Sequence, residues 1–309
     1  MKSMIMNNEN CISPKIPGLF VGLCNLDIAY YSDSPMPEDN GKKKVGDFAV
    51  AIGGPAANAA ITYSLMGGEA KLFCAIGSSQ MGMMMKNMLA QYGVHVIDIW
   101  ENQVSNCNIS SIHVNTANGD RTILSGQSGR DMHTDCLIQL ESLAEKCRFA
   151  LYDGNLPGVE EMLVQQLTHF HKELVLDAGS FKDAFPTCFA MRPTVISSEG
   201  FVDKEQRDVF ELSKIYGFVH SAQTRGAYTI RYEKTGQILE LPVRSATAVD
   251  TLGAGDIFHG AYCYFKYVQN LSFEEALSSA SRFASYSVEK RGVVAGIEFA
   301  RDMFVKENH

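Results

Sequence analysis

Short apolar runs alternate with longer stretches of helical periodicity along most of this chain. A short apolar run bounded by glycine, proline or aspartate is typical of a buried strand, whereas apolar residues three and four positions apart indicate one face of a helix. In the stretch 159–171, for example, apolar residues fall at 159, 162, 163, 167 and 170. Strands that alternate with such helices predict a mostly parallel sheet covered by helices on both faces.

The predicted elements follow this alternation from one end of the chain to the other. We predict strands at 19–26, 48–52, 71–76, 94–100, 149–152, 174–176, 194–196 and 217–219. We predict helices at 56–66, 80–92, 159–171, 254–268 and 273–290, the last two closing the chain.

Two hairpins interrupt the β-α alternation. Asn118-Gly119 lies between alternating runs at 109–115 and 121–124, and Thr235-Gly236 lies between runs at 228–232 and 237–241. An Asn-Gly pair between two alternating runs is a strong local signal for a β-hairpin.

Composition and charge narrow the class of protein. The chain has 27 basic and 35 acidic residues and a formal charge of −8, which argues against nucleic acid or an anionic membrane as a partner. Its eight cysteines are irregularly spaced without a C-x-x-C pair, so we expect free thiols in a reducing cytoplasm. Residues 1–16 lack an apolar signal-peptide core and are expected to form a flexible tail before a single domain at 17–305.

The sequence D-T-L-G-A-G-D at residues 250–256 precedes a stretch with a helical apolar face. Glycines at this place let the backbone turn tightly and approach a ligand. The first N–H groups of a helix have no intrahelical acceptor and lie at the positive end of its dipole, so they form an anion site. Asp256 then has two interpretations: it caps the helix, or it acts as a base beside a transferring phosphoryl group.

Two other phosphate-binding motifs can be tested against the sequence. The P-loop pattern G-x-x-x-x-G-K-[ST] is absent. Residues 253–258 begin like a dinucleotide fingerprint, but the sixth position is Phe258 and the segment lies near the end of the chain. A P-loop kinase and a dehydrogenase are therefore disfavoured.

The motif at 250–256, followed by Phe258 and Gly260-Ala261, resembles the D-T-x-G-A-G-D-x-F-x-G-A signature of the ribokinase-like (PfkB) carbohydrate kinases. Three further motifs follow the order of that family: N-L-D at 25–27, G-G-P-A-A-N at 53–58 and G-D-R-T at 119–122. The resemblance implies a doubly wound α/β fold, a mostly parallel sheet with helices on both faces, and a small β-lid from about 29–52 and 106–125.

The resemblance also assigns roles to individual residues. It implies that Asp256 is the catalytic base and that the backbone N–H groups of Gly253, Ala254, Gly255 and Asp256 form an anion hole for the transferring phosphoryl group.

The sugar and nucleotide contacts are assigned in the same way. The residues that resemble sugar contacts are Asp27, Gly54 and Asn58. The residues at nucleotide-binding positions are Gln223, Arg225, Gly226, Ser287, Val288 and Gly292. Without the resemblance, a turn aspartate, helix packing and a solvated arginine would be the ordinary interpretations of Asp27, Val288 and Arg225.

The metal positions depart from the family pattern. The N-x-x-E motif that organises Mg²⁺ is replaced at 198–201, where Ser198 and Phe201 stand at its two ends. Glu199 is the nearest carboxylate and would act through water, because Mg²⁺ tends to keep its waters. Asp250 and Thr251 lie where some related kinases hold a monovalent cation such as K⁺.

The substrate stays open at this stage. His259 and the segment 291–297 resemble the sulfofructose kinase branch near the fructokinases, but 153–155 lacks the arginine expected to bind a sulfonate. His259 itself either contacts substrate or packs in the core. The resemblance implies ATP-dependent phosphorylation of a primary hydroxyl of a ketose or pentose, with Mg²⁺, and a homodimer formed through the lid. A non-catalytic sugar or nucleotide sensor and a nucleoside kinase are the alternatives.

Overall fold

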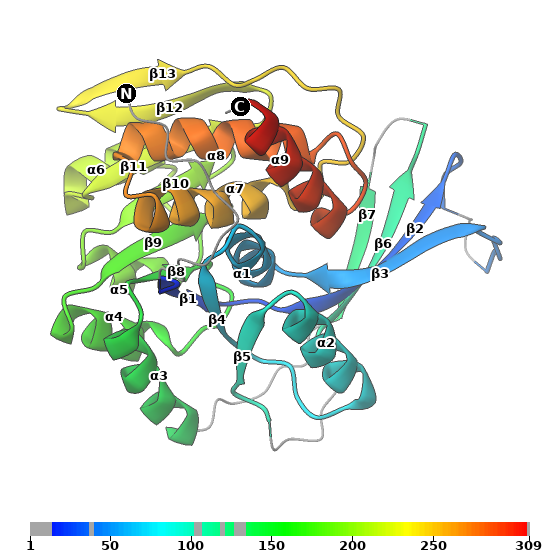
Figure 1. The fold of residues 1–309 in the computed structure, drawn as a ribbon, viewed down its shortest axis with the longest axis horizontal. Coiled ribbons are helices and arrows are strands. Elements are labelled where there is room, and N and C mark those ends of the chain that lie inside the picture. Colours follow the sequence, from blue (N-terminus) through cyan, green and yellow to red (C-terminus); the bar gives the residue numbers. More distant parts are fainter. Residues whose placement is uncertain (1–13, 37–39, 102–106, 118–120, 127–133, 308–309) are drawn as a thin grey trace.

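The structure is a computed structural model that describes residues 14–36, 40–101, 107–117, 121–126 and 134–307. Within this part of the chain, a large sheet is covered by helices on both faces, and a smaller sheet projects from one side of it (Figure 1). The predicted fold class is confirmed. No helix among the described residues combines the length and the apolar character needed to cross a membrane.

The larger sheet has the strand order β13-β12-β11-β10-β9-β8-β1-β4-β5. Its neighbours from β11 to β5 are parallel, whereas β12 and β13 extend one edge as an antiparallel hairpin. The strands are β1 (Pro17–Val21), β4 (Glu69–Cys74), β5 (Val94–Asp98), β8 (Phe149–Tyr152), β9 (Glu173–Ala178), β10 (Thr194–Ser198), β11 (His220–Arg225), β12 (Tyr228–Lys234) and β13 (Gln237–Leu241).

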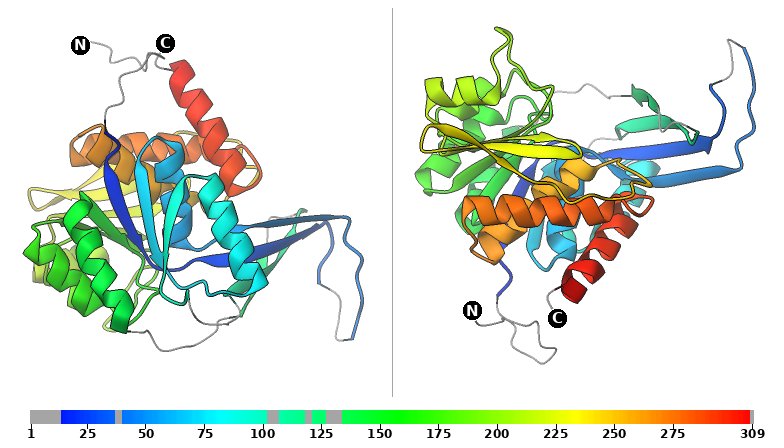
Figure 2. Two further views of the ribbon diagram at one scale, coloured as in Figure 1. Left: turned by 60° about the horizontal axis from the view of Figure 1, so that its bottom comes forward. Right: turned by 90° about the horizontal axis from the view of Figure 1, so that it is seen from above.

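The smaller sheet has the order β3-β2-β6-β7, and we call it the lid. Its strands are β2 (Asn25–Ser32), β3 (Asp47–Gly53), β6 (Ile109–Asn115) and β7 (Arg121–Gly126). The ribbon views show β2 and β3 extending well beyond the body of the molecule (Figure 2). The β6–β7 hairpin is present as predicted, while its turn at 118–120 lies outside the described residues.

Helices pack on both faces of the larger sheet. One face carries α1 (Pro55–Leu65), α2 (Gln80–Gln91), α7 (Ala254–Cys263), a π-helical turn η1 (Tyr264–Val268), α8 (Phe273–Ser287) and α9 (Val293–Glu307). The other face carries α3 (Thr134–Lys146), α4 (Glu160–His169), α5 (Phe185–Phe189) and α6 (Val209–Tyr216).

Strand β1 shows why the sheet is buried on both sides. Successive side chains of a strand point to opposite faces. Phe20 accordingly joins the core under α1 and α7, while Leu19 and Val21 join the core under α3 and α4. All three are 0% exposed, and full burial of such a side chain contributes about 1.5–3 kcal/mol.

The predicted single strand at 19–26 is wrong, because the chain divides it between the two sheets. β1 ends at Val21 and β2 begins at Asn25. Gly22 between them has φ 148°, and a Cβ there would lie 2.0 Å from Oδ1 of Asp153. The glycine therefore permits the bend at which the chain leaves the core and enters the lid.

Three other boundaries differ from the predictions. The strand predicted at 217–219 starts later, at His220, because Gly217 with φ 66° ends α6. The predicted helix at 254–268 is α-helical only to Cys263 and continues as the π-helical turn. The chain closes with a third helix, α9, which the prediction missed although its apolar residues Val293, Ile297 and Ala300 are buried at helical spacing.

Candidate active site

The start of α7 presents backbone N–H groups at the carboxyl-terminal edge of the sheet. Gly253 precedes the helix in the left-handed region, with φ 73°, and its carbonyl accepts the first helical bond from Ile257 at 2.8 Å. The N–H groups of Gly255 and Asp256 have no acceptor among the described residues, whereas that of Ala254 lies 3.3 Å from the Thr251 carbonyl. The free N–H groups leave room for an anion.

Asp256 lies in the first turn of α7 and contacts α1. Its Oδ2 accepts a hydrogen bond from Nδ2 of Asn58 at 2.8 Å. Burial of the carboxylate and repulsion from Asp177 raise the pKa of Asp256 to about 7, although the bond from Asn58 lowers it. A carboxyl group that titrates near neutrality is suited to act as a general base.

Asn58 offers a second polar group at the same place. Its side chain is 4% exposed, and its Oδ1 is buried without a hydrogen-bond partner in the described part of the chain. A buried polar atom normally has a partner, and an orphaned one indicates a missing water or ligand. Oδ1 can accept a hydrogen bond from a substrate hydroxyl while Nδ2 holds Asp256.

Asp27 lies near the start of β2, on the lid side of the same region. Its Oδ1 accepts a hydrogen bond from Nδ2 of Asn25 at 2.5 Å, and the same nitrogen donates to Oγ of Ser110 at 2.8 Å. Burial raises the pKa of Asp27 to about 6, because it outweighs these hydrogen bonds. A Cβ at Gly53 would lie 2.2 Å from Oδ2 of Asp27, so glycine is needed beside this carboxylate.

Gly54 connects the lid to α1. Its φ of 98° lies in a region that favours glycine, and a Cβ there would lie 2.4 Å from the Leu23 carbonyl. This turn places Asn58 one helical turn beyond the end of β3. The structure therefore brings Asn58 and Asp256 into contact and connects Asp27 to them through the turn at Gly53 and Gly54.

The sequence analysis missed a buried aspartate, Asp153, at the end of β8. Its carboxylate accepts hydrogen bonds from the backbone N–H groups of Leu23, Ala56 and Asn155 at 3.0, 3.1 and 2.8 Å. Burial raises the pKa of Asp153 to about 6 despite these bonds. Because the N-cap residue Gly54 has no side chain, Asp153 supplies the cap of α1 from a distant strand.

A second missed aspartate, Asp177, lies in the next strand, β9. It is 6% exposed, and its Oδ2 lies 3.4 Å from Nδ1 of His259. Asp153 and Asp177 both follow short apolar runs that were predicted as strands. Polar residues at the carboxyl ends of parallel strands point to a ligand site, and that signal was available in the sequence.

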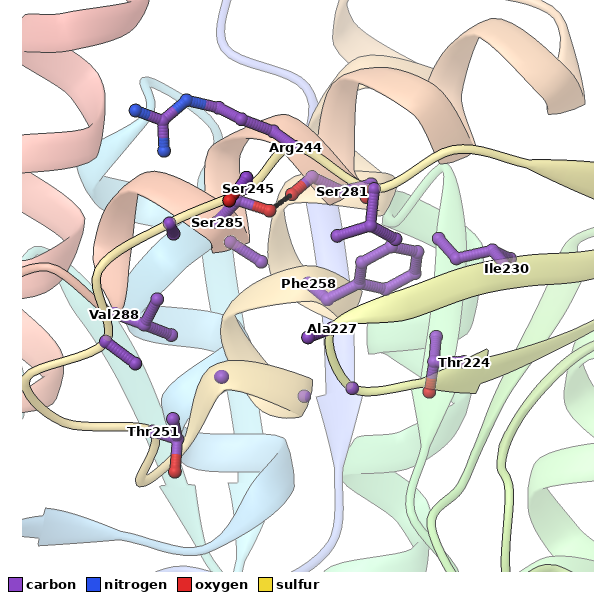
Figure 3. A pocket seen from close by; sticks show the side chains of 17 residues that line it. Thr224, Ala227, Ile230, Arg244, Ser245, Thr251, Phe258, Ser281, Ser285 and Val288 are labelled. Carbon is purple, nitrogen blue, oxygen red and sulfur yellow. Dashed lines mark hydrogen bonds between the residues drawn. The ribbon is translucent and has the colours of Figure 1, made fainter.

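A cavity of about 450 Å³ opens beside the start of α7, between the β11–β12 turn, the segment 243–251 and α8 (Figure 3). Of the predicted nucleotide residues, Gly226 and Val288 line it, and so does Thr251. The sequence analysis missed other lining residues, namely Phe258, Ser281, Ser285 and Arg244. The guanidinium of Arg244 turns away from the cavity in Figure 3, and its Cζ lies 3.9 Å from the centre of the Tyr286 ring.

The remaining predicted nucleotide residues do not line this cavity. Gln223 is 5% exposed and its Oε1 accepts a hydrogen bond from Arg231 at 3.3 Å. Arg225 donates to Thr229 and pairs with Glu240 at 3.1 Å, so the neighbouring hairpin holds its guanidinium.

Ser287 and Gly292 lie at the two ends of the turn that joins α8 to α9. The hydroxyl of Ser287 donates to the Ala284 carbonyl at 2.8 Å, inside the helix. The N–H of Gly292 donates to Oδ2 of Asp250 at 3.1 Å, so this turn contacts the segment at 250–256.

The predicted monovalent-cation position is occupied by an arginine of the lid. Nη2 of Arg121 lies 3.3 Å from Oδ1 of Asp250 and 3.0 Å from Oγ1 of Thr251. Asp250 also accepts the N–H groups of Leu252 at 2.9 Å and Gly292 at 3.1 Å. This arrangement does not fit a bound K⁺, which would have to displace the guanidinium.

The predicted magnesium position offers one carboxylate. Glu199 is exposed just beyond β10, while the neighbouring Ser198 donates its hydroxyl to the Gly179 carbonyl at 2.7 Å. Phe201 is 0% exposed and packs against Phe181. The described residues contain no group of three acidic, histidine or cysteine side chains that could hold a metal by themselves. Glu199 fits a Mg²⁺ ion that is bound mainly by phosphates and water.

Arg291, in the turn between α8 and α9, contacts the lid on the face that carries Asp27. Nη1 of Arg291 lies 2.6 Å from Oδ2 of Asp47, and its Cζ lies 3.3 Å from the centre of the Tyr31 ring. Tyr31 and Asp47 are paired across β2 and β3. Arg291 and Arg121 therefore connect the lid to the two segments that flank the start of α7.

The doubly wound sheet and a lid joined to the start of α7 define the ribokinase-like fold class. The sequence profile described as the pfkB family carbohydrate kinase matches residues 19–300, almost the whole described chain. The chain therefore belongs to the pfkB family of carbohydrate kinases.

Individual relatives agree with this assignment. The chain is 25% identical over 285 residues to the ribokinase of Bacillus subtilis, covering 90% of this chain and 94% of that protein. It is 24% identical over 265 residues to the ribokinase of Haemophilus influenzae, covering 81% and 85% of the two chains. The solved Arabidopsis thaliana ribokinase complexed with ribose and ATP has a TM-score of 0.71 at 17% identity, covering 94% and 98%.

Proposed function

We propose that this protein transfers the γ-phosphoryl group of ATP to a primary hydroxyl of a ketose or pentose, with Asp256 as the general base. The observation that carries the proposal is the contact of Asp256 with Asn58 beside the free N–H groups of Gly255 and Asp256. A base, a hydroxyl-binding amide and an anion hole therefore lie next to one another, the amide on α1 and the other two in the first turn of α7.

In the proposed reaction, Asp27 and Asn58 orient the sugar, and the carboxylate of Asp256 takes the proton of its hydroxyl. The oxygen forms a bond to the γ-phosphorus as the bond to the β-phosphate bridging oxygen breaks, and ADP leaves. The N–H groups at the start of α7 stabilise charge on the transferring group. A bound Mg²⁺ near Glu199 would neutralise phosphate charge.

The nucleotide is proposed to bind in the cavity beside α8. Small side chains such as Ala284 and Ser285 leave room there for a planar base, and the cavity reaches Ala254 and Gly255 at the anion hole. The Arabidopsis relative binds ribose and ATP on the same fold, which supports this assignment. The cavity is not lined by Gln223, Arg225, Ser287 or Gly292. These residues are proposed to lie near the nucleotide without contacting it.

The test is ADP release measured against a panel of acceptors: ribose, fructose, other ketoses, phosphosugars, sulfosugars and nucleosides. We expect saturable ADP release with a pentose or ketose and a product phosphorylated at a primary hydroxyl. Selective turnover of nucleosides would replace the proposal with a nucleoside kinase. Absence of turnover with every acceptor would contradict it.

A non-catalytic sugar or nucleotide sensor is a second candidate. One observation favours it, namely that Phe201 is a core residue and Ser198 bonds to the Gly179 carbonyl where the family pattern has metal-organising side chains. Calorimetry with the same sugars discriminates the two functions, because a sensor binds sugar tightly without releasing ADP.

We also propose a homodimer formed through the lid. Tyr30 pairs with Phe48 across β2 and β3, and Val50 follows two residues later on the same face. These residues and Leu124 are 39%, 63%, 42% and 65% exposed. Strand alternation puts this apolar face opposite Asp27, so a second copy can cover it without closing the sugar site.

Light scattering at several protein concentrations tests this assembly. We expect a dimer for the native chain and a monomer for Leu124→Glu. The matched control is Ile138→Glu on the exposed surface of α3, where the side chain is 72% exposed. A native chain that stays monomeric at all concentrations would contradict the dimer.

The cellular compartment is proposed to be the cytoplasm. Six cysteines in the described part of the chain are free and buried, as expected for a protein kept in a reducing environment.

A further inference from the structure

His259 is a buried ring in α7, one helical turn from Asp256, with oxygen atoms next to both of its nitrogens. Nδ1 lies 2.8 Å from the Gly255 carbonyl oxygen and 3.4 Å from Oδ2 of Asp177. Nε2 lies 3.3 Å from the carbonyl oxygen of Ile196 in the middle of β10. The side chain is 5% exposed, so water contributes little to its contacts.

These neighbours determine how many protons the ring carries. The two carbonyl oxygens accept hydrogen bonds and cannot donate them. A neutral imidazole has one N–H, so its second nitrogen would turn a lone pair toward an oxygen lone pair. A ring with protons on both nitrogens donates at both ends and leaves no such conflict.

The surroundings of Asp177 also favour a ring with protons on both nitrogens. Its Oδ2 is buried and has no hydrogen-bond partner among the described residues, and its one ion-pair partner there is His259. A buried carboxylate without a partner is strongly destabilising. A positive charge on the ring at 3.4 Å compensates the Asp177 carboxylate.

The charges around Asp256 show how His259 and Asp177 affect its ionisation. Asp256 faces Asp177 from β9, Asp153 from β8, the neutral amide of Asn58 from α1 and His259 from its own helix. Three carboxyl groups thus converge at the carboxyl ends of the strands. Repulsion among them favours a protonated and therefore inactive base, and a cation among them favours the ionised base.

We propose that His259 is a positioning residue, an imidazolium held between Asp177 and the Ile196 carbonyl, whose charge keeps Asp256 ionised for catalysis. This inference rests on the proposed role of Asp256 as the base. His259 needs no contact with sugar or nucleotide for this role, because it acts through the charge balance of the site.

The first test reads the ring directly and does not depend on activity. Nitrogen-15 NMR of the native enzyme distinguishes an imidazolium from either neutral tautomer, because both nitrogens of the cation resonate together. We expect both ring nitrogens of His259 to be protonated at pH 7.5. The signal is assigned by its disappearance in His259→Gln. If that variant does not fold, the signal is assigned by through-bond correlation between the ring and the backbone nuclei. A neutral ring at pH 7.5 would overturn the inference.

The second test uses the pH profile of kcat/KM, which reports the essential base of the free enzyme. Loss of the cation in His259→Gln should move the acid limb up by about one pH unit, and loss of the neighbouring anion in Asp177→Asn should move it down by about one. The double variant should lie near the native enzyme. A purely structural role would lower kcat without this pattern of opposite shifts.

Two matched controls carry the same substitutions at exposed positions. The controls are His95→Gln in β5 and Asp183→Asn, whose side chain is 78% exposed. Neither should shift the acid limb of the pH profile of kcat/KM. An unshifted limb in His259→Gln, with Asp256→Asn inactive, would reject the role of His259 but keep Asp256 as the base. Full turnover of Asp256→Asn would instead reject the proposed role of Asp256. The NMR experiment would still show whether the ring of His259 carries one proton or two.

Discussion

Nδ2 of Asn58 lies 2.8 Å from Oδ2 of Asp256 and joins α1 to α7 across 198 positions of the sequence. The hydrogen bond orients the carboxylate, and the other amide atom of Asn58, Oδ1, is buried without a hydrogen-bond partner among the described residues. Asp256, the proposed base, and Asn58, the proposed acceptor for a sugar hydroxyl, are therefore held together.

Replacement of Asp256 by Asn should lower kcat by about 10²–10⁴-fold, which is the usual contribution of a general base. The amide keeps the size of the side chain but accepts no proton. ATP affinity, measured by calorimetry, should change little, because the cavity beside α8 is not altered. Native turnover of this variant would exclude Asp256 as the base.

The pH dependence of activity follows from the raised pKa of Asp256. The base must be ionised, and its pKa is about 7, so kcat/KM should fall as the pH drops below about 7. The measurement is a pH profile with the best acceptor of the panel. An acid limb near pH 4, the ordinary range of a carboxyl group, would show that the site does not raise the pKa.

The pH dependence of stability should have a defined sign. Asp27, Asp153 and Asp256 have folded pKa values of about 6, 6 and 7, above the usual value of about 3.9 for the unfolded chain. Between these values the folded state binds more protons, so the free energy of unfolding should decrease as the pH rises from about 4 to about 7. Urea unfolding of Asp256→Asn should show a smaller decrease, because one of the three groups is gone.

Gly53→Ala should raise KM for the sugar with a smaller effect on ATP binding. The added Cβ would lie 2.2 Å from Oδ2 of Asp27 and would displace that carboxylate. The control is Gly46→Ala, immediately before β3 of the lid, where no atom of the described residues lies within 4 Å of the added group. Equal KM values for the sugar in the two variants would show that Asp27 does not contact the sugar.

Ala248→Trp should weaken ATP binding without unfolding the protein. Ala248 is exposed and lines the cavity, so an indole there would fill part of its volume. Thr247→Trp is the matched control, because Thr247 is also exposed and does not line the cavity. Calorimetry should give a higher Kd for ATP in the first variant alone.

Activity should not depend on K⁺ in the native protein, because Arg121 already contacts Asp250 and Thr251. A KCl titration at constant ionic strength should show no saturable activation. Arg121→Ala removes the guanidinium, and added K⁺ should then increase its activity. Saturable K⁺ activation of the native enzyme would contradict this interpretation of the arginine.

The sequence alone determined the fold class and singled out Asp256 as the proposed base. Local signals sufficed for the strands, the helices and the helix start at 253–256, because periodicity and turn glycines depend on neighbouring residues. They left Asp256 as either a cap or a base, and only the resemblance to the PfkB kinases implied the base. The apolar run at 19–26 was predicted as one strand, because nothing in the run itself shows that the chain bends at Gly22. The bend takes the chain from the larger sheet into the lid.

Only the tertiary structure decided which polar groups share the site. Asp153, Asp177 and His259 lie far apart in the sequence and come together because β8 and β9 end, and α7 begins, at the same edge of the sheet. The structure likewise put Arg121 against Asp250 and buried Phe201. Charge balance depends on distances between elements, and those distances are set by packing rather than by any pattern within one segment.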